Sequence, residues 1–150
     1  MRGIIIRQMI AADILSLVKL ERENFSDPWT ALDFESEQTH SYGITLVAED
    51  EGSPCGYLNA HHVCENVHIN TFCVEKSHRR MGVASSLLNA LFETVLSDGA
   101  EEVTLEVRAG NSPAIFLYEK FGFVPVGVRK RFYRKPEEDA VIMKKELRHG

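Results

Sequence analysis

Three parts of this 150-residue sequence carry residue types that can do chemistry. The segment from Arg79 to Ala84 has two arginines and a glycine, and it precedes an amphipathic stretch whose first turn lacks an acid. Because a helix N-terminus offers free amides and partial positive charge, such a loop suits a phosphate or pyrophosphate. Glu106 and Tyr118 follow, one in an apolar strand-like run and the other in an apolar helical pattern. A carboxylate can accept a proton and a phenol can donate one.

We expect the loop to connect a strand to a helix. Residues 71–74 form a short apolar run before it, and Gly82 removes side-chain bulk where a ligand would approach backbone amides. After the loop, apolar residues recur at three- and four-residue spacings, which predicts a helix of roughly four turns. These residues are Ala84, Leu87, Leu88, Leu91, Phe92, Val95 and Leu96.

The chain before the loop predicts one strand, two helices and a three-stranded meander. Residues 4–6 are isoleucines, and apolar residues at helical spacing follow in residues 14–21. Thr30 is a good N-cap for a second helix that reaches about Thr39. Three further apolar runs are separated by short polar turns, so we expect antiparallel pairing. These runs are residues 44–48, 56–63 and 67–74.

Glu106 is expected on a strand at residues 103–108, after the long helix ends at Gly99. Strand, helix and strand in one sheet form a parallel crossover, and open sheets of this kind bind ligands at the carboxyl ends of their strands. Because side chains alternate along a strand, Glu106 would share a face with Thr104 and Arg108. An ion pair with Arg108 or a neighbouring lysine on an exposed rim is the alternative to a functional role.

Tyr118 is expected on a helix that begins near the same edge of the sheet. Asn111 or Ser112 can cap this helix, Pro113 suits its first turn, and Gly122 ends it. A tyrosine in an apolar helix is commonly a core residue, although its hydroxyl needs a hydrogen-bond partner. A structural role for Tyr118 therefore stays open beside a catalytic one.

The motifs resemble those of a known superfamily. Arg79-x-x-Gly82-x-Ala84 resembles the acyl-CoA pyrophosphate loop of the GNAT acetyltransferases. Residues 105–123 resemble the RimI branch, bacterial enzymes that acetylate the N-terminal alanine of a small-subunit ribosomal protein. An elbow at residues 25–30 and a hairpin at residues 129–143 are also similar, so the resemblance covers nearly the whole chain. The sequence departs from the RimI pattern at Arg79, Ala84 and two additional elbow residues, Ser26 and Asp27.

The resemblance implies a single GNAT domain over residues 1–150, an α/β fold with a mixed sheet of about seven strands and about four helices. It also implies acetyl-CoA as co-substrate and no metal. An opened strand edge at residues 72–74 would offer backbone amides to the reacting carbonyl. The residues expected at the cofactor are Phe72, Cys73, Val74, Arg79, Arg80, Met81, Gly82, Val83, Ala84, Asn111 and Tyr118.

In RimI-like enzymes the glutamate matching Glu106 is the general base, and the tyrosine matching Tyr118 is the general acid. An α-amino group has a pKa of about 8, so a base must remove a proton before the amine attacks at neutral pH. We expect direct attack, because Cys73 has no convincing histidine partner for a covalent step. Trp29 and Tyr133 would flank the peptide, with Glu106 facing its amine.

The resulting prediction is an acetyl-CoA-dependent N-acetyltransferase that modifies the N-terminal alanine of a ribosomal protein. A GNAT enzyme for a small amine is one alternative, but the acidic residues 35, 37 and 49–51 fall on two separate elements. A non-catalytic acyl-CoA-binding module is the other, and the presence of both Glu106 and Tyr118 disfavours it. The acceptor sequence and the oligomeric state stay open.

Composition narrows the class of protein further. The net charge of −5 disfavours direct nucleic-acid binding, apart from a local basic run in residues 129–135. No run approaches the roughly 20 apolar residues of a membrane span, and we see no secretory pattern, so a cytoplasmic protein without membrane contact is predicted. The three cysteines form no CxxC pair, which disfavours a zinc site at His61, His62, Cys64 or His68.

Overall fold

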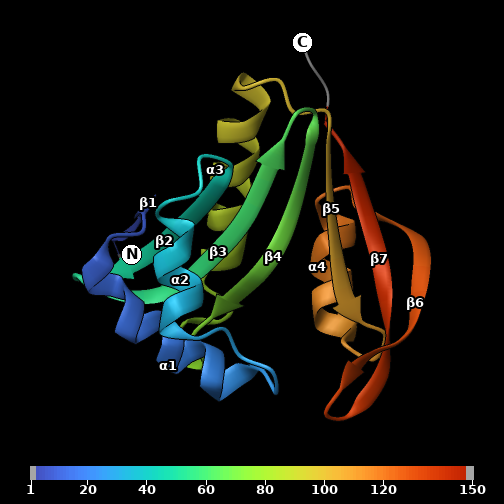
Figure 1. Ribbon diagram of the computed structural model, residues 1–150, viewed down its shortest axis with the longest axis horizontal. Coiled ribbons are helices and arrows are strands. Elements are labelled where there is room, and N and C mark those ends of the chain that lie inside the picture. Colours follow the sequence, from blue (N-terminus) through green and yellow to red (C-terminus); the bar gives the residue numbers. More distant parts are fainter. Residues whose placement is uncertain (1–2, 148–150) are drawn as a thin grey trace.

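The computed structural model of this chain describes residues 3–147, in which one seven-stranded sheet carries helices on both faces (Figure 1). The strands are β1 Ile4–Gln8, β2 Gly43–Asp50, β3 Ser53–Val63, β4 Asn66–Val74, β5 Glu102–Arg108, β6 Val124–Arg134 and β7 Glu137–Glu146. The helices are α1 Ile14–Asn24, α2 Ala31–Glu37, α3 Val83–Ser97 and α4 Ser112–Lys120, with 3-10 turns at Ala11–Asp13 and Lys76–His78. The predicted mixed sheet of about seven strands with about four helices is confirmed.

The first half of the chain folds as its turn and cap residues predict. Strands β2, β3 and β4 form an antiparallel meander, and β1 pairs antiparallel with β2. The amide of Asp33 donates to Thr30 Oγ1 over 3.3 Å, so Thr30 caps α2 as expected. Helix α2 ends at Glu37, earlier than predicted, because the amides of Gln38 and Thr39 bond carbonyls three residues back and tighten the chain into a turn.

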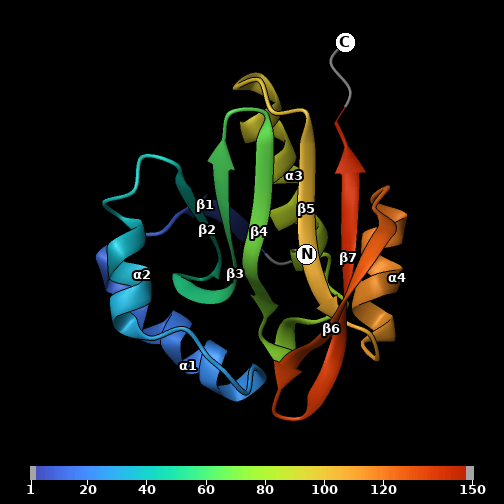
Figure 2. The same ribbon diagram turned by 45° about the vertical axis from the view of Figure 1, so that its right-hand side comes forward.

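Strands β4 and β5 meet only at one end. The sheet order is β1-β2-β3-β4-β5-β7-β6, and β4 and β5 run parallel, as the predicted crossover requires. Their ladder covers only residues 66–68 and 102–104, after which the strands diverge (Figure 2). On its other side β4 has a bulge against β3, which leaves Asn70 as an extra residue. Because a bulge bends and twists its strand, it helps to turn the rest of β4 away from β5.

Two apolar clusters hold the helices to the two faces of the sheet. On one face, α3 contributes fully buried leucines, and α4 contributes Tyr118. On the other face, α1 and α2 contribute Leu17 and Phe34, which pack with Tyr57 of β3. Burying a leucine-sized side chain stabilises a fold by about 1.5–3 kcal/mol. Helices packed on the faces of the sheet therefore fix both diverging strands, and this keeps the space between β4 and β5 open.

Candidate active site

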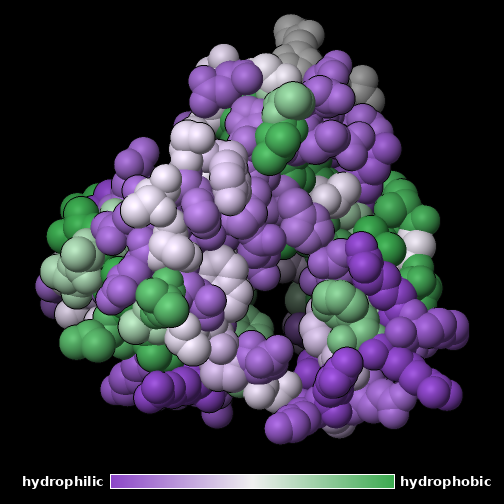
Figure 3. Space-filling model, viewed as in Figure 1, coloured by the Kyte–Doolittle hydropathy of each residue, from purple (hydrophilic) through white to green (hydrophobic). Residues whose placement is uncertain are grey.

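A cavity of about 510 Å³ occupies the space between the diverging halves of β4 and β5. It opens in the lower half of Figure 3, where mostly hydrophilic residues rim it. Six of the residues expected from the sequence to bind cofactor or substrate line its wall: Trp29, Phe72, Glu106, Asn111, Tyr118 and Tyr133. The tertiary structure thus brings together residues that lie more than 100 positions apart in the chain.

Glu106 faces this cavity from β5, with 15% of its side chain exposed. Its Oε1 lies 3.1 Å from His68 Nε2, and its Oε2 lies 3.3 Å from Arg129 Nε. The rim pairing with Arg108 that was considered from sequence is wrong, because the Arg108 guanidinium binds Glu138 over 3.2 Å instead. Glu106 is therefore a partly desolvated carboxylate that reaches the cavity with a histidine and an arginine beside it.

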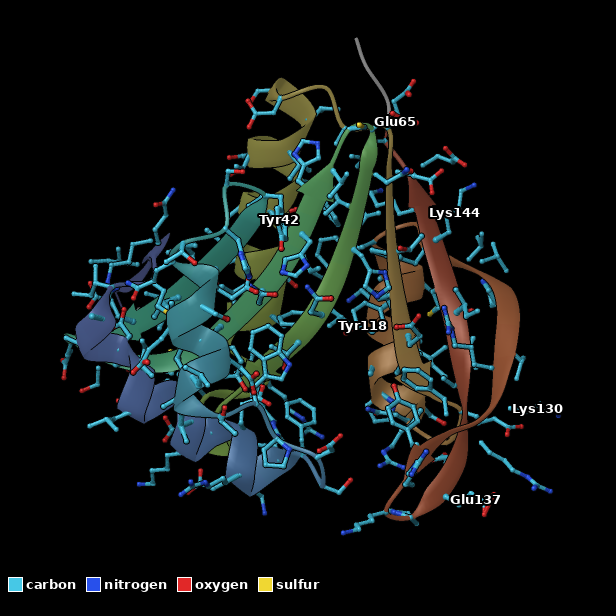
Figure 4. The ribbon with its side chains drawn as sticks, viewed as in Figure 1. Tyr42, Glu65, Tyr118, Lys130, Glu137 and Lys144 are labelled. Carbon is cyan, nitrogen blue, oxygen red and sulfur yellow. The ribbon has the colours of Figure 1, made fainter. Side chains whose placement is uncertain are left out.

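Tyr118 lies on α4 beside the opening between the two strands (Figure 4). Only 8% of the residue is exposed, and its ring contacts those of Phe72 and Phe123. Burial raises the pKa of the Tyr118 phenol above its ordinary value, so it stays protonated at neutral pH. Within residues 3–147 no group accepts a hydrogen bond from its hydroxyl, which leaves the proton available in the cavity. Tyr118 is therefore both a core residue and a candidate proton donor.

Asn111 and Tyr133 complete the wall on the side of β5. Asn111 Oδ1 accepts the amide of Ala114 over 3.3 Å, so Asn111 rather than Ser112 caps α4. The Tyr133 ring lies against the Arg108 guanidinium, 4.3 Å from its centroid. Burial, with a smaller effect from the Glu106 carboxylate, raises the pKa of Tyr133 to about 12. Both phenols of the cavity are therefore neutral at physiological pH.

The glycine loop before α3 lies outside the wall of this cavity but has the expected form. Gly82 has φ +78° and Arg80 has φ +65°, so the loop turns through the left-handed region, which glycine adopts without strain. A Cβ added at Gly82 would meet no atom within 4 Å, and α3 has no acid in its first turn. Free space beside helix amides fits a pyrophosphate. The Arg79 side chain, by contrast, is held by the protein, since it donates to Asn24 Oδ1 over 2.7 Å and to the Val74 carbonyl over 3.2 Å.

The strand edge at residues 72–74 separates from β5 as predicted. The ladder between β4 and β5 stops at His68, so the amides beyond it on that edge have no strand partner among residues 3–147. The Cys73 side chain points the other way, into the cluster with Tyr57, and burial raises the pKa of its thiol to about 11. A protonated, buried thiol is a poor nucleophile. Any role of Cys73 toward a cofactor would therefore use its backbone.

Two functional candidates were missed in the sequence. Glu21 falls in the apolar pattern of α1, and it is 99% buried in the cavity wall. It accepts hydrogen bonds from the Trp29 amide at 2.8 Å and from the hydroxyls of Tyr57 and Thr71, each at 2.5 Å. A glutamate at an apolar helix position was the available signal. Glu21 fixes the elbow that carries Trp29 against β3 and β4.

The second candidate is Arg108, which closes one side of the cavity. Besides Glu138, it donates to the Pro136 carbonyl over 2.9 Å and to Ser26 Oγ over 3.2 Å. Glu138 is part of β7 and also accepts the Gly110 amide. Ser26 is one of the two additional elbow residues. Through Arg108, the elbow and the C-terminal hairpin meet across the cavity mouth.

The comparisons with known proteins decide the family. The family model described as Acetyltransferase (GNAT) family matches residues 14–123. This chain belongs to that family. A Bacillus subtilis protein with the provisional name ribosomal protein bS18-alanine N-acetyltransferase is 33% identical over 139 residues, which cover 92% of each chain. An N-alpha-acetyltransferase of Saccharolobus solfataricus is 31% identical, over 97% of this chain and 95% of its own.

The GNAT fold is also seen in solved structures. The crystal structure of the ribosomal-protein-S18-alanine N-acetyltransferase from Escherichia coli superposes with a TM-score of 0.90 at 25% identity, over 99% of this chain and 96% of that chain. The predicted GNAT and RimI-like resemblance is confirmed, and the chain is a GNAT acetyltransferase. Within residues 3–147, no helix is long and apolar enough to cross a membrane, and no group of three or more His, Cys, Asp or Glu residues is placed to hold a metal.

Proposed function

We propose that this chain is an acetyl-CoA-dependent N-acetyltransferase that acts on a protein N-terminus, with the N-terminal alanine of ribosomal protein bS18 as its acceptor. The observation that carries the proposal is the joint position of Glu106 and Tyr118 in one cavity at the parting of β4 and β5. The names of the Bacillus subtilis and Escherichia coli relatives, which match over nearly their whole length, support the choice of acceptor.

Glu106 and Tyr118 divide the proton transfers in this proposal. Glu106 accepts the proton that the α-ammonium group must lose, directly or through a water. Tyr118 carries a proton throughout the physiological pH range, because its pKa is raised, and gives it to the departing thiolate. The amine attacks the thioester directly, since the buried Cys73 thiol is protonated.

Cofactor and peptide occupy opposite sides of the cavity in this proposal. The amides of residues 79–84 hold the pyrophosphate, while the strand edge at residues 72–74 and Asn111 contact the rest of the acyl-CoA. Trp29 and Tyr133 flank the peptide, and both line the cavity. We also propose that residues 1–150 form one acetyltransferase domain that works in the cytoplasm, where ribosomal proteins are made.

A panel of acceptors tests the function. Peptides with the N-terminal sequence of bS18, the same peptides with a blocked α-amine, an internal-lysine peptide and a polyamine are incubated with acetyl-CoA and followed by mass spectrometry. We expect one acetyl group on the α-amine of the alanine peptide and none on the blocked peptide. Preferential acetylation of the polyamine would replace this proposal with a small-amine acetyltransferase.

A further inference from the structure

The Arg79 side chain joins the loop before α3 to the end of α1. Its Nη2 donates to Asn24 Oδ1 over 2.7 Å, and its Nε donates to the Val74 carbonyl over 3.2 Å. Asn24 is the last residue of α1, and Val74 is the last residue of β4. The loop that follows β4 thus lies beside the end of α1 (Figure 2). Because a guanidinium is a planar fork of donors, it can hold two fixed partners at once.

Asn24 presents its side-chain oxygen to Arg79 in one defined orientation. Its Nδ2 donates to the Leu20 carbonyl over 2.8 Å, so the amide group cannot turn without losing that bond. The positive charge of Arg79 also lies near the carbonyl end of α1, where the helix dipole favours a cation. The next residue, Phe25, has extended backbone and begins the elbow. The contact therefore holds the chain at the point where the helix gives way to the elbow.

The elbow at residues 25–30 forms the acceptor side of the cavity in the proposed function. Phe25, Ser26 and Trp29 of this elbow line the cavity. Within residues 3–147, the hydrogen bonds that hold the elbow itself come from α1, α2 and β5. The contact of Arg79 with Asn24 has a different origin, because it comes from the loop that is proposed to hold the pyrophosphate. A change of order in that loop can therefore reach the elbow through Arg79.

The two arginines of the loop differ in how they are engaged. The guanidinium of Arg79 is directed to α1 and to the end of β4. The side chain of Arg80 makes no hydrogen bond or ion pair within residues 3–147, so its charge is left for an anion. The tertiary structure thus gives Arg79 a protein partner, although both arginines are expected from the sequence at the cofactor.

We propose that Arg79 is a positioning residue that couples acetyl-CoA binding at the loop to acceptor binding at the elbow, an inference that rests on the proposed acetyltransferase function. A pyrophosphate held by residues 79–84 immobilises the loop, and Arg79 then holds Asn24 and the start of the elbow. A ligand that orders a segment lowers the entropic cost for the next ligand that needs the same order. Because coupling is reciprocal, the acceptor tightens cofactor binding by the same factor.

Trp29 reports on the elbow without any acceptor, because it is the single tryptophan of the chain. Acrylamide quenching of its fluorescence is measured with and without saturating CoA, which has no acetyl group to transfer. CoA should protect Trp29 from quenching in the wild type. Arg79→Met keeps the apolar stem but has no donor, so the protection should be lost. A wild type in which CoA does not protect Trp29, or full protection in Arg79→Met, would overturn the coupling.

Arg80→Met is the matched variant, because it removes the same charge from the same loop without touching Asn24. At saturating CoA it should keep the protection of Trp29. Loss of protection in both variants would assign the effect to the charge of the loop and overturn the proposal. In calorimetry, Arg80→Met should weaken CoA binding more than Arg79→Met does. The opposite order would make Arg79 a pyrophosphate ligand instead of a positioning residue.

A double-mutant cycle tests the contact itself. With saturating acetyl-CoA and an alanine-starting peptide, we expect Arg79→Met and Asn24→Ala each to raise the KM for the peptide about fivefold, with little change in kcat. The double variant should lose no more than either single variant, since both substitutions remove one interaction. Losses that add, or a loss in kcat alone, would show that the two residues do not act through this contact and would overturn the proposal.

These outcomes separate the coupling from the proposed function. Protection of Trp29 that depends on Arg79, in a protein that acetylates no N-terminal peptide, would remove the proposed acceptor but keep the coupling between loop and elbow. Acetylation of the alanine-starting peptide with the same KM in the wild type and in Arg79→Met would keep the function and remove the coupling.

Discussion

Tyr118 combines burial in the core with a hydroxyl that is free to act in the cavity. Tyr118→Phe keeps the ring contacts with Phe72 and Phe123 but removes the hydroxyl proton that we propose is given to the thiolate. We expect turnover to fall by roughly 10²-fold or more, with little change in acetyl-CoA affinity. Steady-state kinetics and calorimetry measure the two effects. Tyr42→Phe, which removes a hydroxyl outside the cavity, is the control, and equal losses in binding and turnover would indicate a structural tyrosine.

Glu106 is the other residue whose chemistry can be separated from its packing. Glu106→Gln keeps size and hydrogen bonding, but it cannot accept the ammonium proton. We expect kcat/KM at pH 7 to fall by roughly 10²-fold, and the residual rate to rise with pH as more of the substrate amine becomes neutral. The control is Glu102→Gln on the same strand, where the carboxylate pairs with Lys144 at 3.5 Å. A wild-type pH profile in Glu106→Gln would exclude Glu106 as the base.

At the scale of elements, the loop before α3 can be tested apart from the cavity. Gly82→Asn places a side chain in the open space beside the helix amides, while asparagine tolerates the left-handed backbone. Gly99→Asn is a matched control, since Gly99 also has a positive φ and open space around its Cα. We expect Gly82→Asn to weaken acetyl-CoA binding by at least about tenfold in calorimetry, equivalent to 1.4 kcal/mol. Equal affinities of the two variants would place the pyrophosphate elsewhere.

For the whole molecule, the narrow contact between β4 and β5 makes a thermal test informative. Three residue pairs join the two halves of the sheet, and a ligand held by α3, α4 and both strands would add contacts across them. Acetyl-CoA at about 100 times its Kd should stabilise the native state by about 2.7 kcal/mol, which raises Tm by several degrees. Thermal melts at increasing acetyl-CoA concentration measure this shift. Gly82→Asn should need higher acetyl-CoA concentrations for the same shift in Tm. A Tm that does not change with acetyl-CoA concentration would contradict binding of acetyl-CoA to this protein.

Much of the fold could be read from local patterns. The apolar periodicity of α3, the cap at Thr30 and the short turns of the meander each act within a few residues, and the structure has these elements within two residues of most expected ends. The alternation of β5 also placed Glu106 on the polar face opposite Leu105 correctly. Motifs that match a family then indicated residues 79–84 as the proposed cofactor loop, because the glycine and small residues there serve backbone geometry that is local.

Only the tertiary structure decided the partners of the site residues. Spacing offered Arg108 as the partner of Glu106, yet strand pairing puts His68 of β4 and Arg129 of β6 beside it. Glu21 is stabilised by hydroxyls from two other strands, contacts that no local pattern encodes. Short-range periodicity fixes which way a side chain points. Which charges meet depends on the order of strands in the sheet and on where β4 and β5 part, and both follow from long-range packing.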